Sequence, residues 1–174
     1  MTIMPATTAD IPALNTLINS AYRGETSKKG WTTEADLLDG IRTDPASLLL
    51  LLQKQDAVML TARAQDGTIT GCMFLEKQQR SFYLGMLTVD PQLQAGGIGG
   101  QLLLAAEAYV QQANVYSIRM TVISVRFNLI AWYERHGYKK TGETQPFPSD
   151  PAFGTPRQPL EFLVLEKELG EKQR

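Results

Sequence analysis

The sequence predicts a single α/β domain in which a mixed sheet of about seven strands carries helices on both faces. Two observations favour this class. Segments of helical periodicity alternate with short apolar runs rich in β-branched and aromatic residues. A strand at 81–89 also leads through a glycine-rich loop into a helix. The chain has 174 residues, which suits one domain with a sizeable core. Since no repeat or linker divides it, the domain is expected to span 1–174.

The N-terminal third is predicted to be mostly helical. Thr8 and Thr33 each place a side-chain oxygen at a helix start, and Pro45 suits a first helical turn. Apolar residues follow at helical spacing. The predicted elements are an edge strand at 2–6 and helices at 8–22, 33–41 and 45–53.

The remainder is predicted to alternate strands with two helices. Asp66-Gly67 marks a hairpin, and Gly137 suits a left-handed helix cap. The segment 145–159 contains five prolines and is expected to be a long loop. The predicted strands are 57–64, 68–77, 81–89, 117–124, 138–144 and 160–168, with helices at 99–112 and 128–136.

Composition excludes several classes of function. A net charge of −1 gives no electrostatic reason to expect a nucleic-acid partner. The single cysteine, Cys72, rules out an internal disulfide and suits a reducing cytoplasm, and it lies in an apolar run typical of a buried residue. One histidine and one cysteine give no metal-ligand cluster. The longest apolar run, 48–52, is too short to cross a membrane, and the N-terminus lacks a signal-peptide pattern. We therefore expect a cytoplasmic protein.

A loop with four glycines in five positions follows the strand at 81–89. They are Gly96, Gly97, Gly99 and Gly100. Because glycine has no Cβ, such a loop can turn sharply and aim successive N–H groups at one point. A helix that begins there adds unpaired N–H groups and the positive end of its dipole. The loop is therefore predicted to bind a phosphate or a pyrophosphate.

Three phosphate-binding patterns compete for this loop. A dinucleotide fingerprint starting at Gly97 requires glycine at position 102, where Leu102 stands. A P-loop requires a Gly-Lys pair, which the chain lacks. The third pattern, Gln/Arg-x-x-Gly-x-Gly/Ala, is matched in full from Gln94 to Gly99.

This segment, together with Val89-Asp90-Pro91, resembles motif A of the GNAT acyl-CoA N-acyltransferases. A second segment, Trp132 to Tyr138, is similar to the family's YE-x-x-GF sequence and follows in the same order. The resemblance covers 69–140 well and the two ends in outline. It implies a GNAT-like fold that binds acetyl-CoA in a cleft between splayed parallel strands, here 81–89 and 117–124.

The resemblance also implies which groups hold acetyl-CoA. Splayed strands leave backbone groups without partners, so those of Leu87 and Val89 would pair with the pantetheine amides, and an N–H there would stabilise the oxyanion. The alternative is a fully paired central strand with a glycine loop that serves only as a tight turn. The groups expected to hold the pyrophosphate are the Gln94 side chain and the amides of Ala95, Gly96, Gly97, Gly99 and Gly100.

Tyr133 is the main catalytic candidate. The tyrosine that it matches in the family lies beside the CoA sulfur, so its phenol could protonate the departing thiolate. The alternative is an aromatic core residue. Arg126 stands where many members carry asparagine, and it could reach the phosphates or the acyl end of the cofactor or remain a solvated surface charge.

The general base is a choice among alternatives. Glu76 alternates with Phe74 and Cys72, which favours an inward-facing carboxylate near the cleft. Glu25 in the first loop and a chain of water molecules are the other candidates. His136 beside the helix cap is expected to have a structural role or to face solvent.

These features predict direct transfer of an acetyl group from acetyl-CoA to a primary amine of a small molecule or a peptide, without a covalent enzyme intermediate. A non-catalytic acyl-CoA sensor and an enzyme using a longer acyl donor are the alternatives. The loops at 23–33 and 146–157 could wall the acceptor side with Trp31, Phe147 and Phe153, or these aromatics could anchor the loops to the core. By family analogy, a homodimer through an exposed strand edge is also considered.

Overall fold

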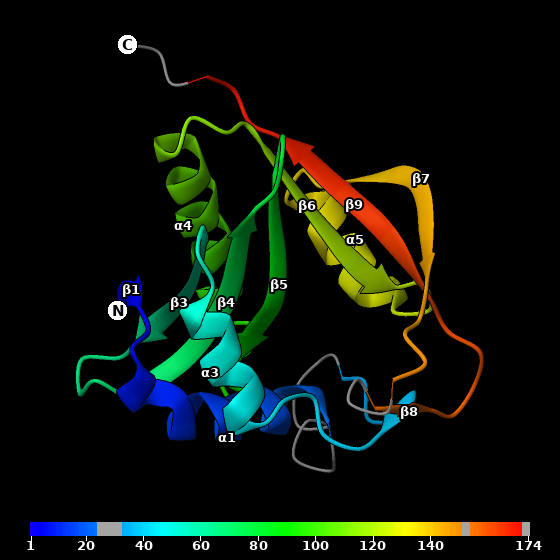
Figure 1. The fold of residues 1–174 in the computed structure, drawn as a ribbon, viewed down its shortest axis with the longest axis horizontal. Helices are drawn as coiled ribbons and strands as arrows, with labels where there is room; N and C mark the ends of the chain where they lie inside the picture. Colours follow the sequence, from blue (N-terminus) through cyan, green and yellow to red (C-terminus); the bar gives the residue numbers. More distant parts are fainter. Residues whose placement is uncertain (24–32, 151–153, 172–174) are drawn as a thin grey trace.

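The computed structural model describes residues 1–23, 33–150 and 154–171, and within them an open seven-stranded mixed sheet (Figure 1). Its strand order is β1-β3-β4-β5-β6-β9-β7, and β2 and β8 form a separate small sheet. The strands are β1 (Thr2–Pro5), β2 (Leu38–Asp39), β3 (Ala57–Arg63), β4 (Ile69–Lys77), β5 (Phe82–Val89), β6 (Ser117–Ile123), β7 (Lys139–Pro146), β8 (Thr155–Pro156) and β9 (Glu161–Glu168). The helices are the 3₁₀ helix η1 (Thr8–Asp10) and the α-helices α1 (Ile11–Tyr22), α3 (Pro45–Gln53), α4 (Ile98–Gln112) and α5 (Phe127–Arg135).

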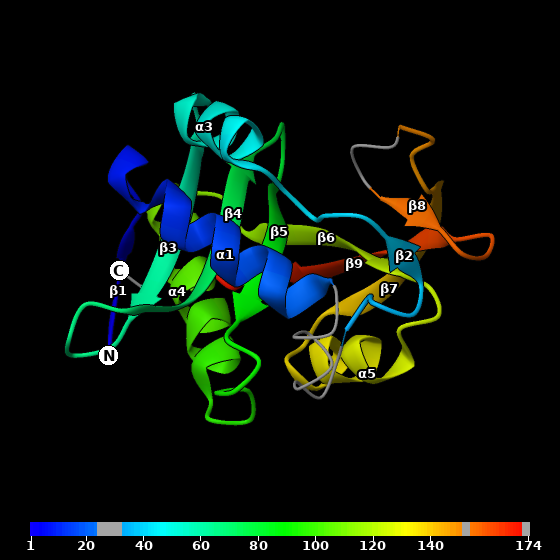
Figure 2. The ribbon, with the colours of Figure 1, turned by 90° about the horizontal axis from the view of Figure 1, so that it is seen from below.

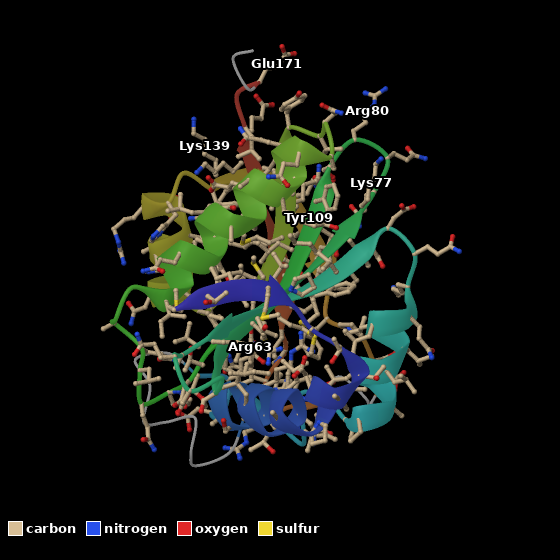
Figure 3. The ribbon with its side chains drawn as sticks, turned by 90° about the vertical axis from the view of Figure 1, so that its left-hand side faces the viewer. Arg63, Lys77, Arg80, Tyr109, Lys139 and Glu171 are labelled. Carbon is tan, nitrogen blue, oxygen red and sulfur yellow. The ribbon has the colours of Figure 1, made fainter. Side chains whose placement is uncertain are left out.

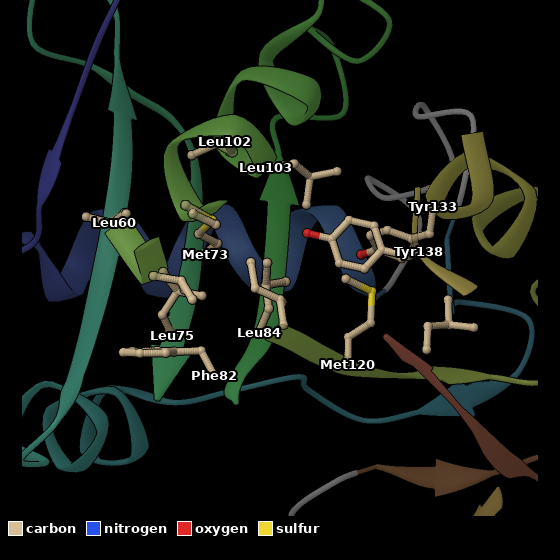
Figure 4. Packing of buried hydrophobic residues seen from close by; sticks show 14 of the residues in the cluster. Leu60, Met73, Leu75, Phe82, Leu84, Leu102, Leu103, Met120, Tyr133 and Tyr138 are labelled. Carbon is tan, nitrogen blue, oxygen red and sulfur yellow. The ribbon is translucent and has the colours of Figure 1, made fainter. Parts of the chain in front are cut away.

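Helices cover both faces of the sheet, as Figure 2 shows, with α1 and α3 on one side and α4 and α5 on the other. Each face has its own apolar cluster. Leu14, Ile18 and Leu48 pack over β3, β4 and β5 on the α1 side. On the other side, residues of α4 and α5 such as Leu103 and Tyr133 pack over the same strands and over β6 (Figure 4). This layering confirms the predicted α/β class.

The two parallel strands at the centre of the sheet pair only at their first residues. β5 and β6 are joined at Phe82 with Ile118 and at Tyr83 with Arg119, and no further pair follows. By contrast, β6 and β9 remain paired along the whole of β6. The rest of β5 therefore separates from β6, as the family resemblance implied.

A β-bulge in β5 changes which face its side chains cover. Cys72 of β4 pairs with Thr88, whereas Phe74 pairs with Gly85, so β5 carries one extra residue in this interval. Met86 takes a left-handed conformation with φ of 53°. Leu84 lies in the α4-side cluster but Met86 lies in the α1-side cluster, although strict alternation would put both on one face. The bulge thus turns the end of β5, including Leu87, toward the α4 side.

The helix predicted at 33–41 is wrong within the described residues. The N–H groups of Leu37 and Leu38 both donate to the Glu34 carbonyl, which closes a single turn, and the chain then enters β2. Leu38 pairs with Pro156 of β8, which lies inside the segment expected to be a loop. Of the apolar residues whose spacing predicted a helix, Leu38 is buried but Ile41 is exposed.

The other predicted elements form within a few residues of their expected bounds. One start differs: Thr7, not Thr8, is the cap, and its N–H and hydroxyl donate to Asp10 in a capping box at the start of η1. β7 also extends to Pro146 at the sheet edge. In the part of the chain that the structure describes, no helix is long and apolar enough to cross a membrane.

Candidate functional site

A cavity of about 410 Å³ lies beside the separated end of β5. Its walls come from four parts of the chain: the end of α1, the last residues of β5, the glycine loop with the first turn of α4, and the inner side of α5. The residues that line it are Ala21, Tyr22, Leu87, Thr88, Val89, Gln94, Ala95, Gly97, Ile98, Gly99, Gly100, Arg126, Leu129, Trp132, Tyr133, Arg135 and His136. The first cavity is therefore bounded by the elements that the two motifs predicted.

The backbone of the glycine loop presents amides to this cavity. Gly97 is the N-cap of α4 and has a φ of 84°, and Ala95 before it also lies in the left-handed region with a φ of 72°. The N–H of Gln101 is the first in α4 to reach a backbone carbonyl, that of Gly97. Within the described chain, the amides of Ile98, Gly99 and Gly100 consequently have no carbonyl partner. Three amides and the positive helix end make an anion site here.

Backbone conformation at Gly97 and close packing at Gly99 explain why glycine is needed at these two positions. Gly97 requires its left-handed φ, which costs an L-residue about 1 kcal/mol or more. A Cβ at Gly99 would lie 3.1 Å from the Trp132 ring, so the loop and α5 approach closely only without one. The Gln94 side chain donates to the Val89 carbonyl at 3.2 Å and ties the loop back to β5.

His136 lies at the glycine-loop end of the cavity. Its Nδ1 lies 2.8 Å from the Trp132 carbonyl, which can only accept, so Nδ1 carries the proton. The other ring nitrogen, Nε2, would lie 3.4 Å from a Cβ at Gly100 and is thus beside the free amides. The ring also packs against the Trp132 indole, with centroids 4.3 Å apart.

A second cavity, of about 250 Å³, shares part of its lining with the first. It is bounded by the middle of β5, by β6 and by Phe147 and Phe162, whose rings stack 5.2 Å apart. The residues that line both cavities are Tyr22, Leu87, Arg126, Leu129 and Tyr133. A group held in one cavity can therefore meet a group held in the other beside Tyr133.

Tyr133 projects from α5 into the core and is 5% exposed (Figure 4). Its ring makes edge contacts with Trp132 and Tyr138 at 5.2 and 6.0 Å. Burial raises the pKa of its phenol well above the usual value of 10, and the positive charge of Arg126 acts in the opposite direction. The phenol is therefore protonated at neutral pH and available as a proton donor.

Tyr22 at the end of α1 contacts β5 where the two cavities share their lining. Its hydroxyl donates to the Leu87 carbonyl at 2.7 Å, and burial raises its pKa to about 12. The guanidinium groups of Arg42 and Arg126 lie over its ring, 5.3 and 5.9 Å from the centroid. The last turn of α1 is thus hydrogen-bonded to β5 at Leu87, beside the bulge.

The sequence matches the family model described as an acetyltransferase (GNAT) domain over residues 43–148. This span includes β3 to β6, the glycine loop, α4 and α5, which carry most of the first cavity. The chain belongs to the GNAT acetyltransferase family.

Solved structures of GNAT proteins share this fold. The ribosomal-protein-alanine N-acetyltransferase from Brucella melitensis is 21% identical with a TM-score of 0.71, over 97% of this chain and 100% of that one. The ribosomal-protein-S18-alanine N-acetyltransferase from Escherichia coli is 16% identical with a TM-score of 0.70, over 99% and 98%. PaiA N-acetyltransferase from Thermoplasma acidophilum, solved with coenzyme A, is 20% identical with a TM-score of 0.67, over 96% and 98%. At such identities the likeness extends to the fold alone. No curated protein sequence matches the chain.

Most of the residues predicted to hold the GNAT cofactor lie together. Eight of the nine, and Tyr133 with them, line the first cavity: Leu87, Val89, Gln94, Ala95, Gly97, Gly99, Gly100 and Arg126. Gly96 does not line it, and its N–H already donates to the Leu93 carbonyl. Arg126 lines both cavities, but its guanidinium is turned to Glu34 and Tyr22 rather than to the loop amides.

Glu76 is not brought to the site. It pairs with Tyr83 near the start of β5, roughly 13 Å along the strand from Leu87 at about 3.3 Å per residue. Glu76 does point to the same face of β4 as Phe74. At the Glu76 end of β4, however, α3 covers that face, and the Glu76 carboxylate pairs with Lys54 at 2.9 Å. Glu76 lines neither cavity.

Sequence reasoning missed three residues that line the second cavity: Tyr22, Glu34 and Arg42. They lie outside both motifs: Tyr22 ends α1, Glu34 lies in the turn before β2, and Arg42 follows β2. Arg23, which also lines the second cavity, begins the 23–33 loop that was expected to wall the acceptor side. The only signal was the density of charge between 23 and 42, which looked like an exposed surface. Of the acceptor-side residues predicted from the loops, Phe147 lines the second cavity, and Glu25, Trp31 and Phe153 lie outside the described residues.

Proposed function

We propose that this protein transfers an acetyl group from acetyl-CoA directly to a primary amine. The observation that supports it most is the position of Tyr133, a protonated phenol between two cavities. One cavity presents unpaired amides suited to a pyrophosphate, and the other is lined by both charged and apolar groups. An acyl donor and an acceptor would meet at the shared wall.

The first cavity offers hydrogen-bonding groups of the kind that acetyl-CoA would need. The amides of Ile98, Gly99 and Gly100, with His136 beside them, would bind the pyrophosphate. The end of β5 lacks a strand neighbour on the β6 side, so its backbone would pair with the pantetheine amides. The carbonyls of Leu87 and Val89 already accept one side-chain hydrogen bond each, and each can accept a second.

The chemistry needs a nucleophile and a proton donor. The neutral amine attacks the thioester carbonyl carbon, a C–N bond forms, and the C–S bond breaks to release CoA as a thiolate. Tyr133 protonates the sulfur and regains a proton from solvent. A backbone N–H at the β5 bulge would stabilise the oxyanion during the attack. Glu76 lies outside both cavities and Glu25 lies outside the described residues, so the proton lost by the amine is assigned in this proposal to water.

Calorimetry and a turnover assay test the proposal together. Purified protein should bind acetyl-CoA and CoA, and mixing it with acetyl-CoA and a panel of primary amines should release free thiol with at least one of them. CoA binding without turnover on any amine would instead indicate an acyl-CoA sensor. No detectable affinity for CoA or acetyl-CoA would refute both functions. Longer acyl-CoA donors in the same assay would define the donor range.

A further inference from the structure

We propose that the hydroxyl of Tyr83 binds the acceptor amine in the second cavity by accepting a hydrogen bond from an N–H of that amine. The inference rests on the proposed acetyl transfer and names the group that places its nucleophile. Tyr83 belongs to β5, and it lines the second cavity but not the first. It therefore stands on the proposed acceptor side.

The Tyr83 ring lies along β5 across Gly85, two residues further on. A Cβ at Gly85 would lie 2.8 Å from Cε1 of the ring and 2.9 Å from its hydroxyl oxygen, which is too close for packed atoms. Side chains two residues apart point to the same face of a strand, so glycine at position 85 leaves the space that the ring occupies. The hydroxyl is thereby held against Gly85, which lines the same cavity.

The Tyr83 hydroxyl is available to a ligand. Within the described chain, no residue forms a hydrogen bond with it, and solvent still reaches the oxygen. The Tyr22 hydroxyl, by contrast, already donates to the Leu87 carbonyl. Burial is the main cause of the raised pKa of Tyr133, and Tyr83 is among the neighbours that raise it further, so the two phenols lie near the same space. A phenol oxygen accepts hydrogen bonds as well as donating one, so it can bind an N–H.

The spacing along β5 suits attack on a thioester held at the bulge. Gly85 and Leu87 are two residues apart, which is roughly 7 Å at about 3.3 Å per residue in a strand. A hydrogen bond of about 3 Å from the hydroxyl to the amine, followed by about 3 Å from the nitrogen to the thioester carbon, spans about 6 Å. An amine bound to the hydroxyl over Gly85 would therefore reach a thioester held beside Leu87.

This hydrogen bond leaves the lone pair of the amine free. A neutral primary amine has two N–H groups and one lone pair. One N–H donates to Tyr83, and the lone pair attacks the thioester carbon. The nitrogen then loses one proton to water, and the amide product keeps one N–H. A single acceptor at Tyr83 is therefore sufficient to orient the nucleophile without blocking the bond that it forms.

Steady-state kinetics of Tyr83→Phe test the inference, because this change removes only the oxygen. The value of kcat/KM for the best amine should fall about fivefold, mainly through KM, while KM for acetyl-CoA stays near wild type. Tyr109→Phe is the matched control: Tyr109 is a partly buried tyrosine on α4, at the opposite face of the sheet (Figure 3), and lines neither cavity. It should change neither value. A kcat/KM for the amine within about twofold of wild type in folded Tyr83→Phe would overturn the inference.

Gly85→Ala displaces the hydroxyl without removing it. The added Cβ would meet the Tyr83 ring at 2.8 Å, so the ring has to move away from position 85. The value of kcat/KM for the amine should fall at least as far as in Tyr83→Phe, because the hydroxyl no longer lies where the amine binds. Thermal unfolding on the same samples shows whether the variant folds. An unchanged kcat/KM in folded Gly85→Ala would count against the inference, and Tyr83→Phe decides alone if Gly85→Ala does not fold.

A binding measurement separates failure of this inference from failure of the proposed function. In calorimetry, n-butylamine and benzylamine should bind the complex of the protein with CoA about fivefold more tightly in wild type than in Tyr83→Phe. If that difference is found but no amine is acetylated, the amine site stands and the transfer fails. If amines are acetylated equally well by both proteins, the transfer stands and the inference is overturned. Neither binding nor turnover of any amine would overturn both.

Discussion

Replacing Tyr133 with phenylalanine should separate catalysis from packing. The ring is 5% exposed and keeps its edge contacts with Trp132 and Tyr138 in the variant. None of the described residues forms a hydrogen bond with its hydroxyl, so the free energy of unfolding should change by less than about 1 kcal/mol. Loss of the proton donor should lower kcat about 100-fold or more, which corresponds to about 2.7 kcal/mol in the barrier.

The assay is free-thiol release with the best amine of the panel, with thermal unfolding measured on the same samples. KM for acetyl-CoA should stay near the wild-type value. Tyr138→Phe is the matched control: it removes one phenol oxygen from a neighbouring buried ring that lines neither cavity, and kcat should hold. A kcat for Tyr133→Phe within about threefold of wild type, in a folded protein, would refute the role of Tyr133 as the acid.

The protonation state of Tyr133 predicts the shape of the pH profile. A general acid works in its protonated form, and burial raises this pKa well above 10. We therefore expect no fall in kcat that depends on the phenol between about pH 7 and 9.5. A descending limb in this range that disappears in Tyr133→Phe would contradict the assignment.

Three further outcomes follow from the structure. Cys72 is fully buried and burial raises its pKa to about 12, so an alkylating reagent at pH 8 should label it only after unfolding. Mass spectrometry would detect the label. Labelling of the native protein would contradict this burial. Gly97→Ala puts a Cβ on a residue with φ of 84°, so it should lower the free energy of unfolding by about 1 kcal/mol in a thermal unfolding experiment. It should also weaken CoA binding in calorimetry. Unchanged binding would mean that the loop amides do not hold the ligand. Glu76→Gln breaks a half-exposed ion pair with Lys54 outside both cavities, so the free energy of unfolding should change by less than about 1 kcal/mol. The value of kcat should stay near wild type. A large fall in kcat would support Glu76 as the base.

Local patterns in the sequence were sufficient for the donor side of the site. The glycine loop, the strand before it and the segment around Tyr133 are each continuous stretches, and each carries its own chemical signal in glycine spacing, apolar alternation or an aromatic pair. Eight of the nine predicted cofactor residues consequently line one cavity. The same local information identified most strands and helices, because their periodicity does not depend on distant partners.

Glu76 and the segment at 33–41 show where local patterns mislead. The alternation that placed Glu76 on one face of β4 was correct, but it carried no information on which helix covers that face. The apolar spacing after Thr33 was helical, yet the pairing of Leu38 with Pro156 more than a hundred residues away decided for a strand. In both cases a long-range contact outweighed a local preference.

By itself, the sequence determined the α/β class, the glycine loop proposed to bind the anion and the tyrosine proposed as the proton donor, because each depends on residues that are neighbours in the chain. Only the tertiary structure revealed the second cavity, which is the proposed acceptor side. The second cavity assembles Arg23, Glu34 and Arg42 with Arg126, across a sequence separation of 92 residues between Glu34 and its second partner. A charged residue that the sequence suggests is exposed becomes buried only when a distant element folds over it, and no local pattern records that event.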